Sequence, residues 1–324
     1  MPLTRRAALA LPFSLLPVAL PSRSRAADWP GRPVRIVVPF TPGGPVDIIA
    51  RVLAPKLESA WGQPVVIENR PGGGGNVGST AVARAAPDGH TLLLCASSHA
   101  INPGLYRNMP FDTVKDFAPC ALLTSGAFIL VVHPSLPVRT LPDLIAYARA
   151  HPGMINYASA GSGSGNHLAG ELFKQMAGVD MVHIPYPGAA PANTAVLSGQ
   201  ALVMFNNMIS AAQHMPDGGM IGLAVTTPSR IKALPDLPAI AEVLPGFEVS
   251  AWYGLLAPAG TSTPIVDQIY RTATSAVADQ AVGGRITGLG LEPAPMGPEQ
   301  FGRFIAIEME KWTRVIEVAK AQVD

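Results

Sequence analysis

The sequence predicts an α/β protein of two lobes that enclose a cleft. Two stretches, 34–51 (VRIVVPFTPGGPVDIIAR) and 156–176, each read as a buried strand, a glycine-rich turn and the start of a helix. The chain has 324 residues, of which 48% are hydrophobic and 14% charged, so two domains with sizeable cores are available. Open α/β sheets bind ligands beyond the carboxyl ends of their strands, where both glycine turns are expected.

The first residues have the pattern of a secretory signal peptide. Arg5 and Arg6 give a basic start, 7–20 is an apolar core, and 24–27 ends in small residues. We therefore predict a signal peptide over 1–27, cleaved after Ala26 or Ala27, and an exported, soluble mature chain. Thr4, Arg5 and Arg6 leave the twin-arginine and the general secretory routes open.

The elements of the first lobe follow from the apolar spacing. Residues 34–40 are rich in β-branched side chains, as in a strand covered on both faces, and a helix from Val46 should end at Gly62. A strand over 65–68, a helix over 77–85 capped by Asn76 or Gly75, and a strand over 91–95 come next.

The second lobe is expected between crossovers near Gly126 and 224–226. Strands are predicted over 118–124, 128–133, 156–160, 182–185, 202–205 and 221–225, with helices over 144–150, from Asn166 to Gly178, and over 190–197. Thr140 and Asp143 resemble a capping box. The chain then returns through an extended stretch over 247–257, a helix capped by Thr263, and a last helix over 299–318. The predicted domains are thus 28–126 with 226–324, and 127–225.

The glycine turn at 41–45 is a candidate anion site. A strand that feeds a helix through Gly43 and Gly44 presents unpaired backbone N–H groups at a positive helix end, although an ordinary strand-to-helix turn gives the same pattern. Asp47 in the first turn is either a structural cap or a partner for an ammonium or hydroxyl, and the structural role is favoured because capping needs no ligand.

Several kinds of site are excluded or weak. Gly73, Gly75 and Gly78 match the dinucleotide fingerprint, but they follow the second strand in an exported chain. Ser162, Ser164 and His167 lack the spacing of a nucleophile elbow. The seven histidines show no metal-ligand spacing, and no carboxylate pair indicates a glycosidase. We expect no catalytic residue, metal or cofactor.

Charge and cysteine content narrow the partners further. The totals of 23 Lys and Arg against 22 Asp and Glu give no field that favours nucleic acid. Cys95 and Cys120 both lie in apolar, strand-like runs, so we expect free thiols rather than a disulfide, although an exported chain permits one.

A set of ordered motifs resembles one known family. PFTPGGPVD, VVIENRPGGGGNVG, DGHTLL, HAINPGLY, VKDFAP, NYASAGSGSGNHLAGELF, VHIPYPGAAPA and WYGLLAPAGT occur in this order over nearly the whole mature chain. Together they resemble the solute-binding proteins of tripartite tricarboxylate transporters, also called the Bug family. The resemblance implies a periplasmic binding protein of type II-like fold, with a cleft between two doubly wound α/β domains.

The resemblance also implies a ligand and a site. Family ligands are mostly carboxylates, namely di- and tricarboxylates, acidic amino acids and aromatic acids, held between the Pro-Gly-Gly loop and the Ser/Gly loop. The matching positions are Phe40, Thr41, Pro42, Gly43, Gly44 and Asp47, then Ser97 and Ser98, then Ser162, Gly163, Ser164, Asn166 and His167, and finally Asn206. Asn206 stands where the family often has Asp, which puts a preference for ammonium-bearing ligands in doubt.

We therefore expect a periplasmic receptor, monomeric and not an enzyme, that captures a small carboxylate for the permease subunits of a tripartite transporter. A receptor that signals to a membrane sensor is the alternative, and an exported hydrolase on the same frame is a further one. The sequence does not distinguish transport from signalling, nor one carboxylate from another.

Overall fold

The computed structural model describes residues 29–319, so the predicted signal peptide lies outside the described residues. The first elements are β1 (Val34–Val38), α1 (Pro45–Trp61), β2 (Val65–Asn69), the 3-10 turn η1 (Gly73–Gly75), α2 (Asn76–Ala83), β3 (Thr91–Ala96), α3 (Ser98–Leu105) and β4 (Phe117–Val132). Next come α4 (Leu141–Ala150), β5 (Ile155–Ser159), α5 (Gly165–Ala177), β6 (Met181–Pro185), α6 (Ala189–Leu197), β7 (Val203–Asn207), α7 (Met208–His214) and β8 (Ile221–Val225). The last are η2 (Ile240–Glu242), β9 (Ser250–Pro258), α8 (Thr263–Ala278), α9 (Gln280–Gly288), β10 (Leu291–Met296) and α10 (Pro298–Ala319).

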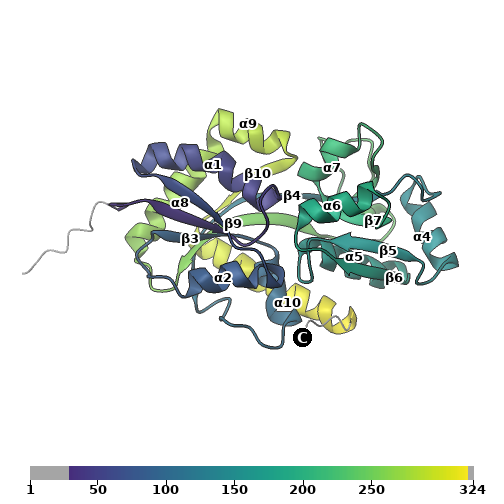
Figure 1. Cartoon of the computed structure of the whole chain (residues 1–324), viewed down its shortest axis with the longest axis horizontal. Helices are drawn as coiled ribbons and strands as arrows, with labels where there is room; N and C mark the ends of the chain where they lie inside the picture. Colours follow the sequence, from purple (N-terminus) through teal and green to yellow (C-terminus); the bar gives the residue numbers. More distant parts are fainter. Residues whose placement is uncertain (1–28, 320–324) are drawn as a thin grey trace, which may run out of the picture.

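The strands form two groups that share the long strand β4 (Figure 1). In the first lobe the order is β2-β1-β3-β9-β4, with β10 also paired to β4. In the second lobe the order is β4-β7-β5-β6, with β8 also paired to β4. Residues 117–127 of β4 pair with β9, and 128–132 pair with β7, so one strand passes directly from one lobe to the other.

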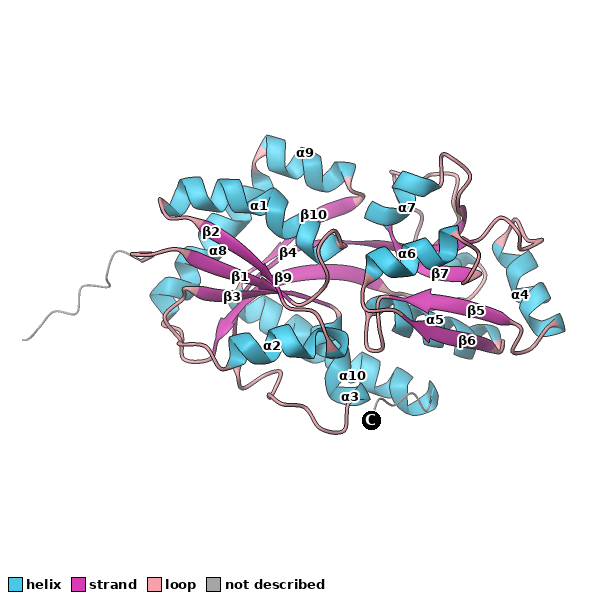
Figure 2. Ribbon diagram, viewed as in Figure 1, coloured by secondary structure: helices cyan, strands magenta, loops and turns pink. Residues whose placement is uncertain are grey.

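The strand directions place the helix starts at the junction of the lobes. β1, β2 and β3 are parallel to one another, as are β5, β6 and β7, so in each lobe the carboxyl ends of these strands lie at one edge. The helices α1 and α3 follow β1 and β3, and α5, α6 and α7 follow β5, β6 and β7. Figure 2 shows these strands running toward the space between the lobes.

Alternation along β1 explains how both faces of the first-lobe sheet are covered. Val34, Ile36 and Val38 pack in the large core with α1 and α8, whereas Val37 packs in a separate cluster with Val82 of α2 and Phe301 of α10. Side chains of a strand point alternately to opposite faces, and all four valine and isoleucine side chains are almost fully buried. This agrees with the predicted strand covered on both faces.

Most predicted elements are present, with some corrections. The two strands predicted over 118–124 and 128–133 are one continuous strand, β4, and the predicted crossover at Gly126 lies inside it. The helix expected to be capped by Thr263 begins at that residue, and its N-cap is Ser262. The Thr140 capping box and the left-handed Gly62 and Gly178 at helix ends are confirmed.

Two further observations concern cysteines and membranes. Cys95 and Cys120 are free and buried, as expected, and they belong to different core clusters. Burial raises the pKa of the Cys120 thiol to about 12. No helix between residues 29 and 319 is long and apolar enough to cross a membrane.

Candidate functional site

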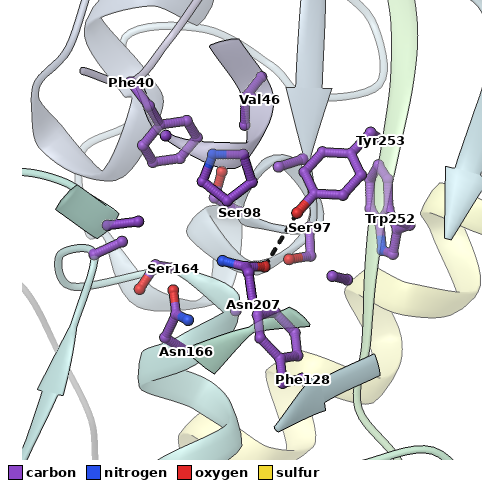
Figure 3. Close-up of a pocket in the computed structure, with 17 residues that line it drawn as sticks. Phe40, Val46, Ser97, Ser98, Phe128, Ser164, Asn166, Asn207, Trp252 and Tyr253 are labelled. Atoms are coloured by element: carbon purple, nitrogen blue, oxygen red, sulfur yellow. Dashed lines mark hydrogen bonds between the residues drawn. The ribbon is translucent and has the colours of Figure 1, made fainter. Parts of the chain in front are cut away.

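A pocket with about 460 Å³ of empty space, including the solvent at its open side, lies where the lobes meet (Figure 3). The first lobe contributes Phe40, Gly44, Pro45, Val46, Ala96, Ser97, Ser98, Ala251, Trp252 and Tyr253 to its lining. The second lobe, with the shared strand β4, contributes Phe128, Ala160, Ser164, Gly165, Asn166, Ala189 and Asn207. A molecule in this pocket would therefore contact both lobes.

Four helices of eight or more residues begin in the lining. They are α1 at Gly44 and Val46, α3 at Ser97 and Ser98, α5 at Ser164 and Asn166, and α6 at Ala189. The first N–H groups of a helix have no acceptor within the helix, and the peptide dipoles add partial positive charge there. These helix starts supply the pocket with hydrogen-bond donors and a positive potential without any cationic side chain.

The first glycine loop is held in place by Asp47. The Asp47 carboxylate accepts hydrogen bonds from the Gly43 N–H, the Asn69 amide and the Arg51 guanidinium at 2.9, 3.0 and 2.9 Å. Burial raises the pKa of Asp47, but the hydrogen bonds from Arg51, Gly43 and Asn69 outweigh it and lower the pKa. Asp47 lies outside the lining, and its contacts match the structural role that the sequence favours.

Phe40, Gly44 and Pro45 line the pocket at this turn. Thr41, Pro42 and Gly43 lie outside the lining, and Gly43 has the positive φ of 77° that the turn requires. Gly44 has an ordinary φ of −79° and is the N-cap of α1. Glycine at position 44 therefore allows the backbone to lie close to the pocket, and it is not required by an unusual backbone conformation.

His167, which lies outside the pocket lining, holds the second glycine loop, residues 161–165, in place. Ser164 and Asn166 line the pocket, whereas Ser162, Gly163 and His167 do not. The Gly163 N–H donates to His167 Nδ1 at 3.3 Å, and the Ser162 carbonyl accepts from the Tyr106 hydroxyl of the first lobe at 3.3 Å. These residues hold the loop that carries Ser164.

Ser164 is a helix cap. Its hydroxyl donates to the Gly161 carbonyl at 2.6 Å and accepts from the His167 N–H at 3.4 Å. The His167 ring meets Gly163 and stacks on His183, with ring centroids 4.0 Å apart. Burial lowers the pKa of His167 to about 4 and that of His183 to about 3, so both rings are neutral near pH 7.

The strand β7 brings Asn207, rather than Asn206, to the pocket. Neighbouring residues of a strand point to opposite faces, and Asn206 is fully buried, where its amide donates to Asn193 Oδ1 at 2.8 Å. Asn207 accepts a hydrogen bond from the Tyr253 hydroxyl at 3.1 Å, drawn in Figure 3. This bond uses the side-chain oxygen of Asn207, so its amide N–H groups can donate to a ligand.

Of the fourteen predicted site residues, six line the pocket, namely Phe40, Gly44, Ser97, Ser98, Ser164 and Asn166. The sequence reasoning missed Asn207 and the ring side chains of Phe128, Trp252 and Tyr253. The doublet Asn206-Asn207 after a strand and the motif WYGLLAPAGT were visible signals for Asn207, Trp252 and Tyr253. Phe128 has no such local signal, because it reaches the pocket only through the course of β4.

Within the described residues no cluster of His, Cys, Asp and Glu could hold a metal ion. None of the described residues in the lining carries a charge. The pocket thus offers hydroxyls, amides, backbone N–H groups and apolar surface to a small molecule.

The chain is similar to known proteins over most of its length. Residues 49–320 match the family described as the tripartite tricarboxylate transporter family receptor. The chain is 36% identical over 301 residues to Protein BugT of Bordetella pertussis, covering 92% of each chain.

Solved structures show the same two-lobed fold. Rpa4515 of R. palustris with adipate is 36% identical with a TM-score of 0.88, covering 91% of this chain and 100% of that one. MatC of Rhodopseudomonas palustris with bound malate is 33% identical with a TM-score of 0.84, covering 89% and 100%. The periplasmic binding protein BugD is 34% identical with a TM-score of 0.85, covering 91% and 99%. The chain therefore belongs to the tripartite tricarboxylate transporter receptors, a family of periplasmic solute-binding proteins rather than enzymes.

Proposed function

We propose that this protein captures a small carboxylate in the pocket between its lobes and delivers it to the permease subunits of a tripartite transporter. The observation that carries the proposal is the convergence of four helix starts on a pocket with no charged lining residue among those described. Two structures similar to this one hold adipate and malate. Both of these ligands are carboxylates.

The carboxylate would be held by groups from both lobes. Backbone N–H groups at the starts of α1 and α3 come from the first lobe, and those of α5 and α6 come from the second. The hydroxyls of Ser97, Ser98 and Ser164 lie in the same lining and add donors, with water bridging where a gap remains. Each donor is fixed by its helix, so binding requires little reorganisation of these groups.

We further propose that the two units that move are 28–126 with 226–324, and 127–225. A ligand that contacts both units binds their closed arrangement better and shifts the population toward it. In the same proposal, residues 1–27 direct export to the periplasm, and the mature protein works there as a monomer that releases its ligand unchanged.

Calorimetric titration with adipate, malate and other carboxylic acids tests the proposal. In Gly44→Val, two methyl groups enter the pocket lining at the start of α1, and we expect at least about a hundredfold loss of affinity, or roughly 2.7 kcal/mol. Gly284→Val is the matched control, because Gly284 lies on α9 with open space around it and an ordinary backbone conformation.

Parent-like binding by Gly44→Val, with circular dichroism showing a folded protein, would contradict the first-loop site. Failure of every acid to bind the parent would overturn the carboxylate assignment. Uptake of a labelled acid by cells with and without the gene then tests delivery to a permease, and mass spectrometry of the recovered acid tests for turnover.

A further inference from the structure

The charges around the pocket restrict which other groups a ligand can carry in addition to its carboxylate. The lining includes six side chains with hydroxyl or amide groups, Ser97, Ser98, Ser164, Asn166, Asn207 and Tyr253, and among the described lining residues none is acidic. A buried ammonium group needs a carboxylate or several well-placed acceptors, because an unpaired charge out of water is costly. Neutral oxygens of this lining accept hydrogen bonds but bring no net negative charge.

The buried carboxylates of the described chain are all paired elsewhere. Asp47, Glu171 and Glu308 are 3%, 7% and 7% exposed, and none of them lines the pocket. Asp47 is paired with Arg51 at 2.9 Å, Glu171 with Lys174 at 3.0 Å and Glu308 with Lys311 at 3.4 Å. Because each negative charge is compensated locally, little of it remains to attract a cation in the pocket.

The helix starts make the pocket still less favourable for an ammonium group. The positive ends of α1, α3, α5 and α6 meet at the lining, as described above. They favour the carboxylate of a ligand and repel an ammonium group placed beside it. An α-amino acid carries its ammonium one carbon from its carboxylate, so the two groups would share the same positive environment.

The remainder of the wall is apolar. Figure 3 shows the rings of Phe40, Phe128, Trp252 and Tyr253 around the polar centre. The indole N–H of Trp252 donates to Glu308 at 3.0 Å, so the polar atom of this side chain is used outside the lining. Val46, Ala160, Ala189 and Ala251 complete a surface that suits a hydrocarbon body.

We propose that the ligand is a carboxylate with a hydrocarbon body and no ammonium group, and that the pocket rejects the corresponding amino acids. This proposal rests on the proposed function of the same site. It narrows the candidates from carboxylates in general to unaminated aliphatic or aromatic acids.

Matched acid pairs test the proposal by calorimetric titration. The pairs are glutarate and glutamate, adipate and 2-aminoadipate, and 3-phenylpropionate and phenylalanine, which differ only by the α-ammonium group. We expect at least one unaminated acid to bind, and its aminated partner to bind at least about tenfold more weakly. A smaller difference, or binding by the aminated acids alone, would overturn the inference while leaving the proposed function intact, whereas no binding by any acid, aminated or not, would overturn the proposed function itself.

Asn207→Asp provides the converse test. It places a carboxylate in the lining with nearly the same shape, and the Tyr253 hydroxyl can still donate to it. We expect the affinity ratio of aminated to unaminated acid to rise at least about tenfold. Asn108→Asp adds the same charge at an exposed position outside the lining and should keep the parent's ratio. An unchanged ratio in folded Asn207→Asp would overturn the inference, and the acid pairs on the parent remain decisive if this variant does not fold.

Discussion

At the scale of single residues, His167 and His183 show how side chains outside the pocket lining hold the loop that carries Ser164. His183 Nε2 lies 2.6 Å from the hydroxyl of Ser159, which also receives the Gly161 N–H, while His167 receives the Gly163 N–H. Both imidazoles are therefore tied to the glycine loop that carries Ser164. The sequence analysis predicted His167 as a site residue, whereas His183, on the neighbouring strand β6, occurred only within the motif VHIPYPGAAPA and was given no role.

This pair predicts a defined pH dependence of stability. The folded pKa values are about 4 and about 3, below the unfolded value near 6.5 because burial disfavours the charged ring. The unfolded chain then binds more protons, so the stability present above about pH 6.5 is lost as the pH falls toward the folded values. Between about pH 7.5 and 5 we expect each imidazole to lower the free energy of unfolding by roughly 2 kcal/mol, measured by urea denaturation.

Neighbouring charged and titratable groups also change the pKa of His183. The Glu171 carboxylate raises the pKa of His183, while His167 and Lys174 lower it. His183→Gln should remove about half of the predicted loss. His151→Gln, at an exposed position, is the control and should keep the parent's pH dependence. An equal free energy of unfolding at both pH values would show that the rings are hydrated in the folded protein.

Residues at helix starts were the most predictable part of the site. Gly44, Ser164 and Asn166 belong to glycine turns and helix starts that a short stretch of sequence predicts, whereas Ser97 and Ser98 were expected only through the family resemblance, since helix α3 was not predicted. The aromatic wall was not predictable in this way. Phe128 looks like an ordinary core residue of an apolar strand, and only the assembled sheet shows that it faces the pocket, while the motif WYGLLAPAGT was the one signal for Trp252.

At the scale of elements, the helix α4 is a case in which local rules sufficed. The Thr140 hydroxyl accepts from the Asp143 N–H at 3.2 Å, and the Asp143 carboxylate accepts from the Thr140 N–H at 3.0 Å. We expect Thr140→Ala to lower the free energy of unfolding by about 1 kcal/mol without changing ligand affinity, because α4 does not contribute to the lining. Urea denaturation and calorimetry measure the two quantities.

Thr194→Ala is the control for this prediction. Thr194 is an exposed residue within α6, and its hydroxyl donates to the Ala190 carbonyl rather than capping a helix start. Alanine there should be neutral or slightly stabilising, since it is the better helix former. An equal effect of both substitutions would show that the capping box contributes nothing measurable.

Three of the elements that the sequence missed, α3, α9 and β10, break local rules. The helix α3 contains Pro103 and Gly104, and α9 contains Gly283 and Gly284, all of which disfavour a helix interior. The strand β10 contains Pro293 and Pro295, which a strand tolerates only where ladder hydrogen bonds are not required. Each forms because tertiary packing compensates, as where β10 pairs with residues 122–126 of β4.

At the scale of the whole molecule, the lobes share β4 and also touch beside the pocket. The Tyr106 hydroxyl of the first lobe donates to the Ser162 carbonyl of the second. On the other loop, a Cβ atom added to Gly188 would lie 2.2 Å from Thr41 Oγ1. Neither Gly188 nor Thr41 lines the pocket. Direct contact between the lobes thus contributes to the arrangement that a ligand would bind, and no local sequence pattern predicts which loops meet.

Gly188→Ala tests this contact without straining the backbone. Gly188 has φ 166° and ψ 176°, an extended conformation that alanine adopts readily, and the three atoms nearest to the added methyl group all belong to Thr41. An obstruction that costs closure about 1.4 kcal/mol weakens the apparent affinity about tenfold, because only the closed population binds tightly. Calorimetry should show this loss, and small-angle scattering at saturating ligand should show a smaller decrease in radius than in the parent.

Thr41→Ala combined with Gly188→Ala should restore most of the affinity. Removing Oγ1 leaves Thr41 Cβ, 3.3 Å from the added methyl group, as the tightest remaining contact, which a small shift relieves. Thr41→Ala alone should bind about as well as the parent, because the Thr41 hydroxyl is buried without a hydrogen-bond partner among the described residues. If Gly188→Ala binds as tightly as the parent, the two loops do not meet in the ligand-bound state. If the double variant stays as weak as Gly188→Ala, the loss arises from a change within the second lobe rather than from contact between the lobes.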